Sequence, residues 1–594
     1  MVSNPLIQNL ETDYSETSVD LSTVMFDRYM KKIHDKNLRF RSKKAKAGSG
    51  LWSILTVIIA LLVSIPILTV AVNLFIPAGE VWSHLASTVL PDYVKNSIWL
   101  MLGVGFGVFV LGVGTAWLVT MCRFPGSRWL NWLLILPMAV PAYLMAYTYT
   151  DFLAFTGPVQ HLLRSVTGWE FGDYWFPNIR SLGGAIVMMS FVFFPYVYLL
   201  TRAAFLEQSS SVLEASRSLG ATPFQSFRKI ALPLARPSIA AGMALALMET
   251  LNDFGTVDYF SVQTFTTGIY RTWFGLGERA AASQLAGFLM VFVLFLILLE
   301  RWSRSNMKIE QRSTGSFKSL YIYELSGWKA WGATIFCSTP LLIGFIIPTS
   351  ILAEMMISNF DVAVDSRFIQ YSLNTITVAL LAGLAALIVA LVLAYGVRLN
   401  PGFVTKVGTR IGSMGYAIPG SVIAVGILIP FGWVDNSIDG WLRSQFGISS
   451  GLLLSGTIFA LIFAYVVRFL AVAFNTVEAS LANITPQMDD AAEGLGYGYG
   501  KILRKIHMPI MSGSLFAAIM LVIVDVIKEL PATLIVRPFN FDTLAVQVYR
   551  LASDERLAES SGAALAIILV GLVPVYILSK SISKSRNFRG KSIN

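Results

Sequence analysis

The chain has 594 residues, of which 55% are hydrophobic and 13% are charged. Soluble globular proteins carry about 25% charged residues, so this composition excludes an ordinary soluble domain and predicts that lipid surrounds much of the chain. The net charge of +10 lies mainly in loops and tails between apolar runs, which argues against nucleic-acid binding. The two cysteines and four histidines have no disulfide or metal-ligand spacing.

Residues 1–50 are polar, with an acidic part followed by a basic part. The first apolar run begins too late, and is too long, for a secretory signal peptide. This segment is predicted to be a largely disordered cytoplasmic tail. Contact of its basic part with anionic lipid headgroups is an alternative.

Twelve apolar segments follow, each near the ~20 residues that a helix needs to cross a bilayer. They predict an all-α membrane protein with about twelve transmembrane helices. The predicted crossings of the first half are 51–76, 97–120, 129–149, 183–201, 237–257 and 283–300. Those of the second half are 330–353, 373–396, 411–430, 452–474, 513–535 and 562–579.

The basic residues indicate the orientation. Lys and Arg gather in the N-terminal tail, in every second loop and in the C-terminal tail, whereas the loop at 354–372 contains only Arg367. With twelve crossings, the basic segments all fall on one side. The positive-inside rule then places both termini in the cytoplasm.

A sequence pattern occurs once in each half, between the fourth and fifth crossings. In the first half it consists of Glu214, Ala215, Gly220 and Pro233. The second copy follows at one constant offset along the chain and consists of Asp490, Ala491 with Ala492, Gly496 and Pro509. Asn96 and Asn374 are separated by nearly the same offset and follow the same order, so the two halves form a parallel repeat.

This pattern resembles the EAA loop of type I ATP-binding-cassette (ABC) importer permeases. The resemblance implies two tandem six-helix repeats, at 51–305 and 330–580, with coupling loops at about 208–235 and 484–511. A cytoplasmic linker at 306–329 and a basic tail at 581–594 complete the expected organisation. In that family each coupling loop forms a short helix that docks on a homodimeric ATPase subunit.

The chain has no phosphate-binding loop of its own. Gly500-Lys501 is followed by Ile502, and Gly590-Lys591-Ser592 has Ser585 where the first glycine is required. The chain is therefore predicted to be a transport subunit and not an enzyme. It is expected to bind no cofactor, because ATP and Mg would be bound by the partner ATPase.

Four acidic residues lie inside predicted crossings, where a charge costs about 2.5–3.5 kcal/mol at a helix centre. They form two i,i+4 pairs, Glu249 with Asp253 and Asp525 with Glu529, which are related by the same offset as the loop pattern. They are predicted to line the translocation pathway, with metal contact during transit as a further hypothesis. The alternatives are pairing with Lys528 or Arg271, or short helices that leave the acids in water.

Further stretches of the first half resemble fused iron(III) importer permeases, among them Met248-Glu249-Thr250-Leu251-Asn252-Asp253 and Thr266-Thr267-Gly268-Ile269-Tyr270-Arg271. This resemblance implies transport of ferric ion across a bacterial cytoplasmic membrane. A periplasmic or lipid-anchored iron-binding protein would deliver the ion. Thiamine or another small solute remains an alternative, as does a secondary transporter that uses no ATP.

Overall fold

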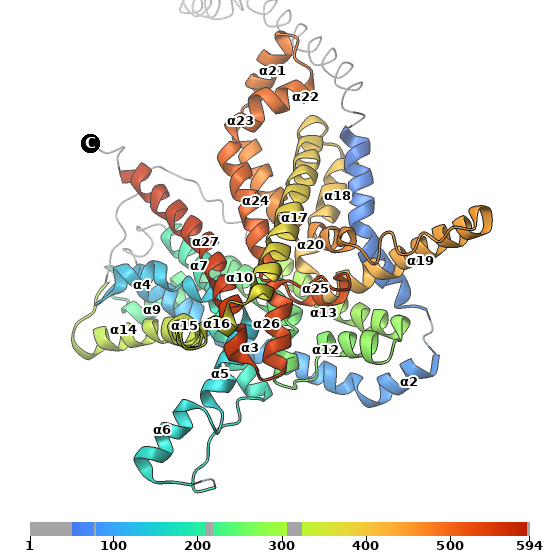
Figure 1. Cartoon of the computed structure of the whole chain (residues 1–594). Coiled ribbons are helices and arrows are strands. Elements are labelled where there is room, and N and C mark those ends of the chain that lie inside the picture. The colour runs from blue at the N-terminus through green and yellow to red at the C-terminus, as the bar shows by residue number, and fades with distance from the viewer. Residues whose placement is uncertain are drawn as a thin grey trace, which may run out of the picture.

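The computed structural model describes residues 50, 52–76, 79–170, 172–207, 216, 218–305 and 323–590 (Figure 1). Nearly all of the regular structure in these residues is helical. A single pair of two-residue parallel strands joins β1 (Cys122–Arg123) to β2 (Tyr323–Glu324). The expected tail at 1–49, most of the linker and the four last residues lie outside the described residues.

The first half begins with the helix Trp52–Asn73. Its other helices are α2 (Gly79–Thr88), α3 (Leu90–Met121), α4 (Ser127–Leu133), η1 (Leu136–Ala139), α5 (Ala142–Leu153), α6 (Pro158–Thr167), α7 (Leu182–Glu207), α9 (Pro223–Ser226), η2 (Phe227–Ala231), α10 (Leu232–Asn252), α11 (Gly255–Tyr259), α12 (Phe265–Tyr270), η3 (Arg271–Gly275) and α13 (Arg279–Ser305).

The second half has the same succession. Its helices are α14 (Gly327–Leu341), η4 (Leu342–Ile346), α15 (Ile347–Ser358), α16 (Phe360–Ala363), α17 (Ser366–Leu399), α18 (Phe403–Gly412), η5 (Gly415–Ala417), α19 (Gly420–Phe446), α20 (Ile458–Ala482), α21 (Pro486–Gly494), α22 (Tyr499–Ile502), η6 (Leu503–His507), α23 (Met508–Ile510), α24 (Ser512–Ile527), α25 (Pro531–Val536), α26 (Leu544–Ser553) and α27 (Leu557–Gly590).

The described residues contain ten helices long and apolar enough to cross a membrane, and two bent helix pairs that raise the number to twelve. The predicted all-α class with about twelve crossings is therefore confirmed. The third crossing, predicted as one helix, bends by 91° between Ser127–Ala139 and Ala142–Thr167. Pro137 and Pro141 explain the break, because proline lacks the amide hydrogen that continues a helix.

Other predicted boundaries differ as well, and three of these differences concern the surroundings of the site. The ninth crossing is predicted at 411–430, but η5 precedes it and the long helix α19 begins only at Gly420. The fifth and eleventh crossings end at Asn252 and Ile527, before the positions predicted from hydropathy. Both ends lie next to acidic residues that accept hydrogen bonds from the following short helix.

The repeat is visible in the packing of equivalent helices. In the first half α3 packs along α7, and α7 along α10; in the second, α17 packs along α20 and α24. Asn96 and Asn374 also make the same hydrogen bond. Their amides donate to the carbonyl oxygens of Gln263 and Asp542, at 2.9 and 3.0 Å.

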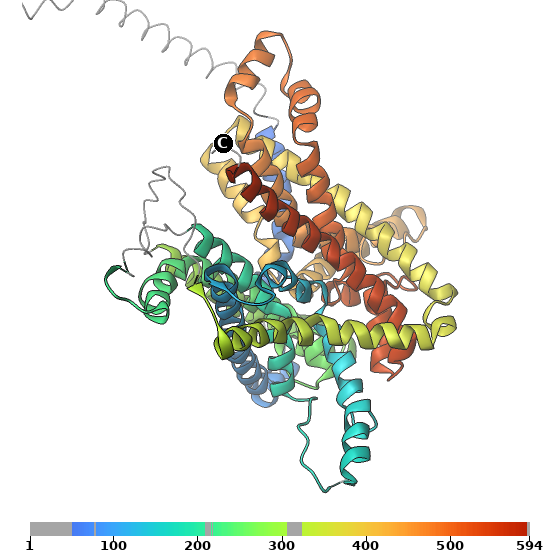
Figure 2. The ribbon, with the colours of Figure 1, turned by 90° about the vertical axis from the view of Figure 1, so that its left-hand side faces the viewer.

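The two halves interlock rather than lying side by side. The helix Trp52–Asn73 of the first half reaches α19, where Gly426 lies so close that an added Cβ would be 2.3 Å from the Pro66 oxygen. In η4, Gly344 lies in the same way against Pro137 of the first half. Small residues allow such close helix contacts in membranes. Figure 2 shows α27, in red, crossing the molecule between the two halves.

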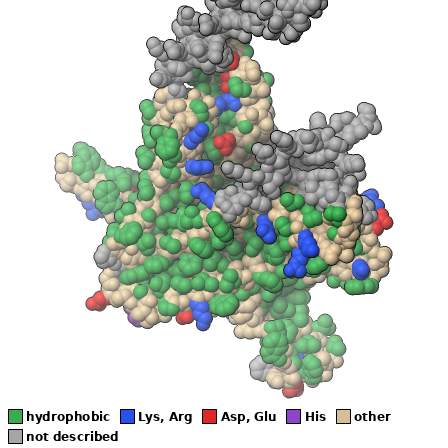
Figure 3. Space-filling model, turned by 180° about the vertical axis from the view of Figure 1, so that it is seen from behind, with side chains coloured by type: hydrophobic (Ala, Val, Ile, Leu, Met, Phe, Trp, Pro, Cys, Tyr) green, Lys and Arg blue, Asp and Glu red, His purple; other side chains and the backbone are tan. Residues whose placement is uncertain are grey.

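A broad hydrophobic surface covers one face of the molecule, with few charged side chains within it (Figure 3). Elsewhere in the described residues too, large apolar side chains such as Phe106, Leu298 and Ile388 are exposed. In water so large an apolar surface would be unfavourable. It is the surface expected of a protein whose middle is surrounded by lipid.

Candidate functional site

The two predicted coupling loops contain the same turn. Gly220 and Gly496 have φ angles of +79° and +81°. Next to them, the amides of Ala221 and Tyr497 donate to the oxygens of Ser216 and Ala492, at 3.0 and 3.1 Å. This left-handed conformation favours glycine, because a Cβ would approach the following carbonyl oxygen. The predicted turn glycines thus occupy equivalent positions.

The residues around these turns are also arranged alike. A π-helical turn, η2 or η6, precedes the helix segment that begins near Pro233 or Pro509. Asp490, Ala491 and Ala492 lie on α21, with Ala492 buried. Glu214 and Ala215 lie outside the described residues. Figure 1 shows α21 and α22 at the upper tip of the molecule.

A leucine precedes each turn glycine and projects from the protein. Leu219 is 88% exposed and Leu495 is 78% exposed. These two residues are related by the same offset as the rest of the pattern, so the repeat could have revealed them. Each is a single exposed apolar side chain at an equivalent position of the repeat.

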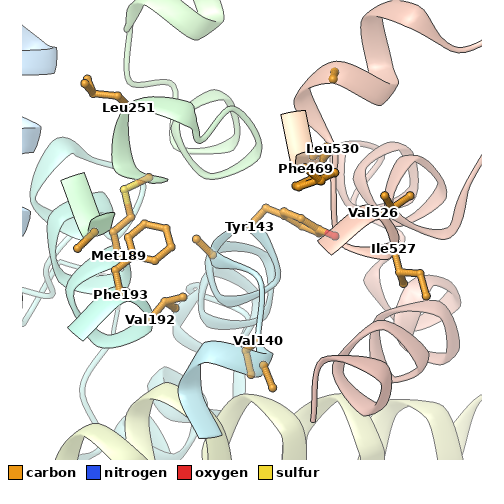
Figure 4. Close-up of a cluster of buried hydrophobic side chains, with 14 of the residues drawn as sticks. Val140, Tyr143, Met189, Val192, Phe193, Leu251, Phe469, Val526, Ile527 and Leu530 are labelled. Carbon is orange, nitrogen blue, oxygen red and sulfur yellow. The ribbon is translucent and has the colours of Figure 1, made fainter. Parts of the chain in front are cut away.

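All four predicted acids line one cavity at the junction of the halves. The region contains about 730 Å³ of space between atoms, open solvent included, and its wall includes Glu249, Asp253, Asp525 and Glu529. The cavity also borders the hydrophobic cluster of Figure 4, in which Tyr143 lies between side chains of the first half and those of the second. The sequence repeat thus predicted residues that the fold brings together.

Two of the acids lie beyond the helices that were predicted to carry them. The Asp253 carboxylate accepts hydrogen bonds from the amides of Thr256 and Val257, at 3.0 and 3.2 Å, and from the Thr256 hydroxyl. Glu529 accepts bonds from the amides of Ala532 and Thr533, both at 3.1 Å, and from the Thr533 hydroxyl. Both carboxylates therefore cap the start of a short helix, α11 or α25.

The other two acids remain on their helices and have different partners. Asp525 forms a salt bridge of 2.9 Å with Lys528. Glu249 accepts a hydrogen bond of 3.4 Å from the amide of Asn252. Of the two predicted basic partners, Lys528 therefore pairs with one of the four acids. Arg271 instead lies 3.8 Å from Asp258.

Arg468 is a cavity residue that the sequence analysis missed. It lies in α20, is 5% exposed, and places its Nε 3.9 Å from the Glu529 carboxylate. Its Nη1 donates to the Asn252 side-chain oxygen at 2.8 Å, and this oxygen also accepts the Gly420 amide. A basic residue inside the apolar stretch 452–474 was a visible signal, because ionisable residues in crossings are rare and functional.

The acids do not form a ready metal site. Within the described residues, no three His, Cys, Asp or Glu side chains lie close enough together to hold a metal ion. The Tyr143, Tyr196 and Tyr416 side chains also line the wall.

Comparison with known proteins defines the type of transporter. Residues 109–308 match the family described as the binding-protein-dependent transport system inner membrane component. An Fe(3+)-transport system permease protein, FbpB 2, from Haemophilus influenzae is 26% identical over 494 residues, which are 83% of this chain and 90% of the relative. The matched segment identifies a binding-protein-dependent inner membrane transport component, that is, a permease. The long match agrees with the two fused repeats of the fold.

Other relatives of this permease differ in length. The ferric transport system permease protein FbpB of Actinobacillus pleuropneumoniae is 22% identical over 81% of this chain and 70% of its own length. The molybdenum transport system permease protein ModB of Escherichia coli is 26% identical over 36% of this chain and 91% of its own. The permease is thus an inner membrane, multi-pass component that works with a separate ATPase and a binding protein.

Proposed function

We propose that this permease carries ferric ion across the bacterial cytoplasmic membrane. The relatives that extend over both halves are named as ferric transport permeases, whereas the molybdenum relative corresponds to about one half. The cavity supports a cation as well, because its wall has four acids and only two bases, Arg468 and Lys528. Carboxylate and phenol oxygens are hard ligands suited to such an ion.

The coupling loops transmit the movement of the ATPase in this proposal. Gly220 and Gly496 occupy equivalent turns, and Leu219 and Leu495 are exposed beside them. Pro233 and Pro509 lie at the start of equivalent helix segments, in α10 and α23. We place these two loops against a homodimeric ATPase in the cytoplasm, and their contact residues include Glu214, Ala215, Asp490, Ala491 and Ala492. Both chain termini lie on the same, cytoplasmic side. When the ATPase draws the two coupling loops together, the cavity opens alternately to the two sides of the membrane.

Reconstitution tests the transported ion. The permease, its ATPase and its binding protein would be placed in vesicles, and ATP-dependent accumulation of radiolabelled ferric ion would be measured. Sulfate and molybdate serve as competing solutes, and an ATPase that cannot hydrolyse ATP serves as control. Accumulation of ferric ion is expected with active ATPase only. Uptake of an oxyanion instead, or ferric uptake without ATPase, would contradict the proposal.

Cross-linking tests the orientation. A cysteine at Leu495 should form a cross-link to the ATPase and should be labelled only from the cytoplasmic side. The native Cys122 and Cys337 are buried and provide little background. Cysteine in place of Trp175, an exposed residue of the loop between α6 and α7, is the matched control and should be labelled from outside. The reverse pattern would overturn the predicted topology.

A further inference from the structure

The Tyr549 hydroxyl joins the two halves on the far side of the cavity from the coupling loops. It belongs to α26 and donates to the Asp258 carboxylate of α11 at 2.9 Å. Both helices lie beyond the cavity acids, in the segment between the fifth and sixth crossings of their half. Each partner also has a neighbour in its own half, since Arg271 lies 3.8 Å from Asp258 and the Ser553 hydroxyl lies beside that of Tyr549. The bond between the halves can therefore break without leaving either group unpartnered.

An ion pair makes a second contact between the halves on this side. Arg180, in the loop before α7, lies 3.7 Å from Glu555, in the loop before α27. Within its own half, Arg180 donates to the Tyr259 hydroxyl at 3.2 Å, and its guanidinium lies over the Tyr259 ring. Tyr259 follows Asp258 in α11, so both contacts meet at one short helix. Because both charged side chains are exposed, the pair is weak and is screened by salt.

Aromatic rings fill the space between these contacts and the cavity. Phe254 lines the cavity, is 2% exposed, and has its ring centre 5.6 Å from that of Tyr549. Tyr147 of α5 is 0% exposed, and its ring centre lies 4.6 Å from Tyr259 and 5.8 Å from Tyr143, which lines the cavity. A water-filled path along these rings would expose Phe254 and Tyr147, and both are buried. The cavity is therefore closed toward this side.

The equivalent tyrosine of the first half does not make such a bond. Tyr270 corresponds to Tyr549 in the repeat. Its ring packs on Phe254 and Phe274 of its own half. Arg537 of the second half acts on the Tyr270 hydroxyl electrostatically, but among the described residues no hydrogen bond joins Tyr270 to that half. Of these two matched tyrosines, only Tyr549 connects the halves through a hydrogen bond.

We propose that the Tyr549–Asp258 hydrogen bond and the Arg180–Glu555 ion pair form an outer gate, which keeps the cavity closed to the extracytoplasmic side in this conformation. The gate opens when the halves separate on that side, because both contacts join one half to the other. Tyr549 and Arg180 are positioning residues that hold the halves together and do not contact the transported ion. This inference rests on the alternating access of the proposed function.

Labelling of a cavity cysteine measures the gate. Val192 lines the cavity and is buried, and Val192→Cys changes its volume little. The complex of this reference variant with its ATPase, in vesicles without nucleotide or binding protein, would be treated from the extracytoplasmic side with a small cationic thiosulfonate that cannot cross the membrane. Labelling should be slow in the reference. It should be about tenfold faster when Tyr549→Phe is added, the factor that one hydrogen bond to a charged group contributes to an equilibrium.

The repeat supplies the matched control for this experiment. Tyr270→Phe removes the equivalent hydroxyl, and its labelling rate should stay within about twofold of the reference. Glu555→Gln should accelerate labelling only about twofold, since an exposed ion pair contributes little. Gel filtration verifies that each variant assembles. Equal rates in Tyr549→Phe and the reference, the same acceleration in Tyr270→Phe, or rapid labelling of the reference itself would overturn the gate.

Binding of ATP provides a second measurement that needs no labelling. If opening of the outer gate is coupled to closure of the ATPase, a weaker gate must favour the ATP-bound state, because coupling between two sites is reciprocal. Tyr549→Phe should therefore raise the affinity for ATP, measured with an ATPase that cannot hydrolyse it, by up to about tenfold. Unchanged affinity would contradict this coupling. Neither measurement involves ferric ion, so a complex that fails to carry ferric ion would refute the proposed substrate and not the gate.

Discussion

The two coupling loops have the same turn but are fastened to the helix bundle by different interactions. In the second half, Asp489 of α21 forms an ion pair with Arg398 of α17 at 2.9 Å and a hydrogen bond with the His507 ring of η6 at 2.7 Å. In the first half, Ala231 occupies the position equivalent to His507, and the buried Trp117 of α3 packs on Phe205 and Phe227 instead. In the described residues of the two loops, which leave out 208–215 and 217, the turn is the same and these contacts differ.

This difference has a physical consequence. Arg398 also donates to the carbonyl oxygens of Leu481 and Ile484, at 2.7 and 2.9 Å, so its guanidinium fixes the direction in which α21 leaves the bundle. Aromatic packing is less directional, because ring pairs tolerate several geometries of similar energy. We therefore expect the second loop to be the more rigid lever and the first to be more tolerant of conservative change.

The largest expected effect is that of Trp117→Ala. Removal of a buried tryptophan costs about 3–5 kcal/mol, through lost contacts and the cavity left behind. The thermal midpoint of the purified complex should fall, and the yield of assembled complex should fall with it. Both are measurable in detergent by intrinsic fluorescence and gel filtration. An unchanged midpoint would show that the aromatic cluster does not anchor the first loop.

Arg398→Ala should have the second-largest effect. It removes a partly buried ion pair and two bonds to carbonyl oxygens, and we expect a loss of about 2–3 kcal/mol because the site retains some access to water. Since the fold of the bundle does not depend on this contact, ATPase binding should persist while uptake per ATP hydrolysed decreases. The ratio of the two rates is the measurement. A variant that transports with normal coupling would contradict the anchoring role of Arg398.

The sequence was sufficient for the helical class, the approximate number of crossings and the repeat, because these depend on long apolar runs and on a regular offset. It also located Glu249, Asp253, Asp525 and Glu529, which the fold brings to one cavity. It could not place the ends of the helices that precede Asp253 and Glu529, because hydropathy does not register a side chain that accepts amide hydrogens from the next helix. Nor could it show that Arg468 approaches both halves, since that contact depends on tertiary packing.

Conservative substitutions measure how specific each of the two anchoring contacts is. Arg398→Lys keeps the charge but cannot reproduce the three directed bonds of the guanidinium, and should cost about 1–2 kcal/mol. Trp117→Phe keeps an aromatic ring against Phe205 and Phe227 and should cost less, about 1 kcal/mol. Thermal midpoints of the two variants, measured side by side, give the order. If Trp117→Phe is the more damaging, the aromatic anchor is the more specific of the two.

Effects of about the same size as those of the conservative substitutions are expected where the halves are most alike, at Gly220 and Gly496. An alanine Cβ would meet no other atom within 4 Å at either position, so its cost arises only from the left-handed φ angle. That cost is roughly 1–2 kcal/mol, and it should be equal in Gly220→Ala and Gly496→Ala because the φ angles differ by little. Each variant should reduce uptake moderately while membrane insertion remains normal.

A bulkier residue should add little to the effect of alanine, since the surrounding space is open. Equal losses would show that the two turns do the same work despite their different anchors. If only Gly496→Ala impairs uptake, the rigid second lever alone transmits the movement of the ATPase.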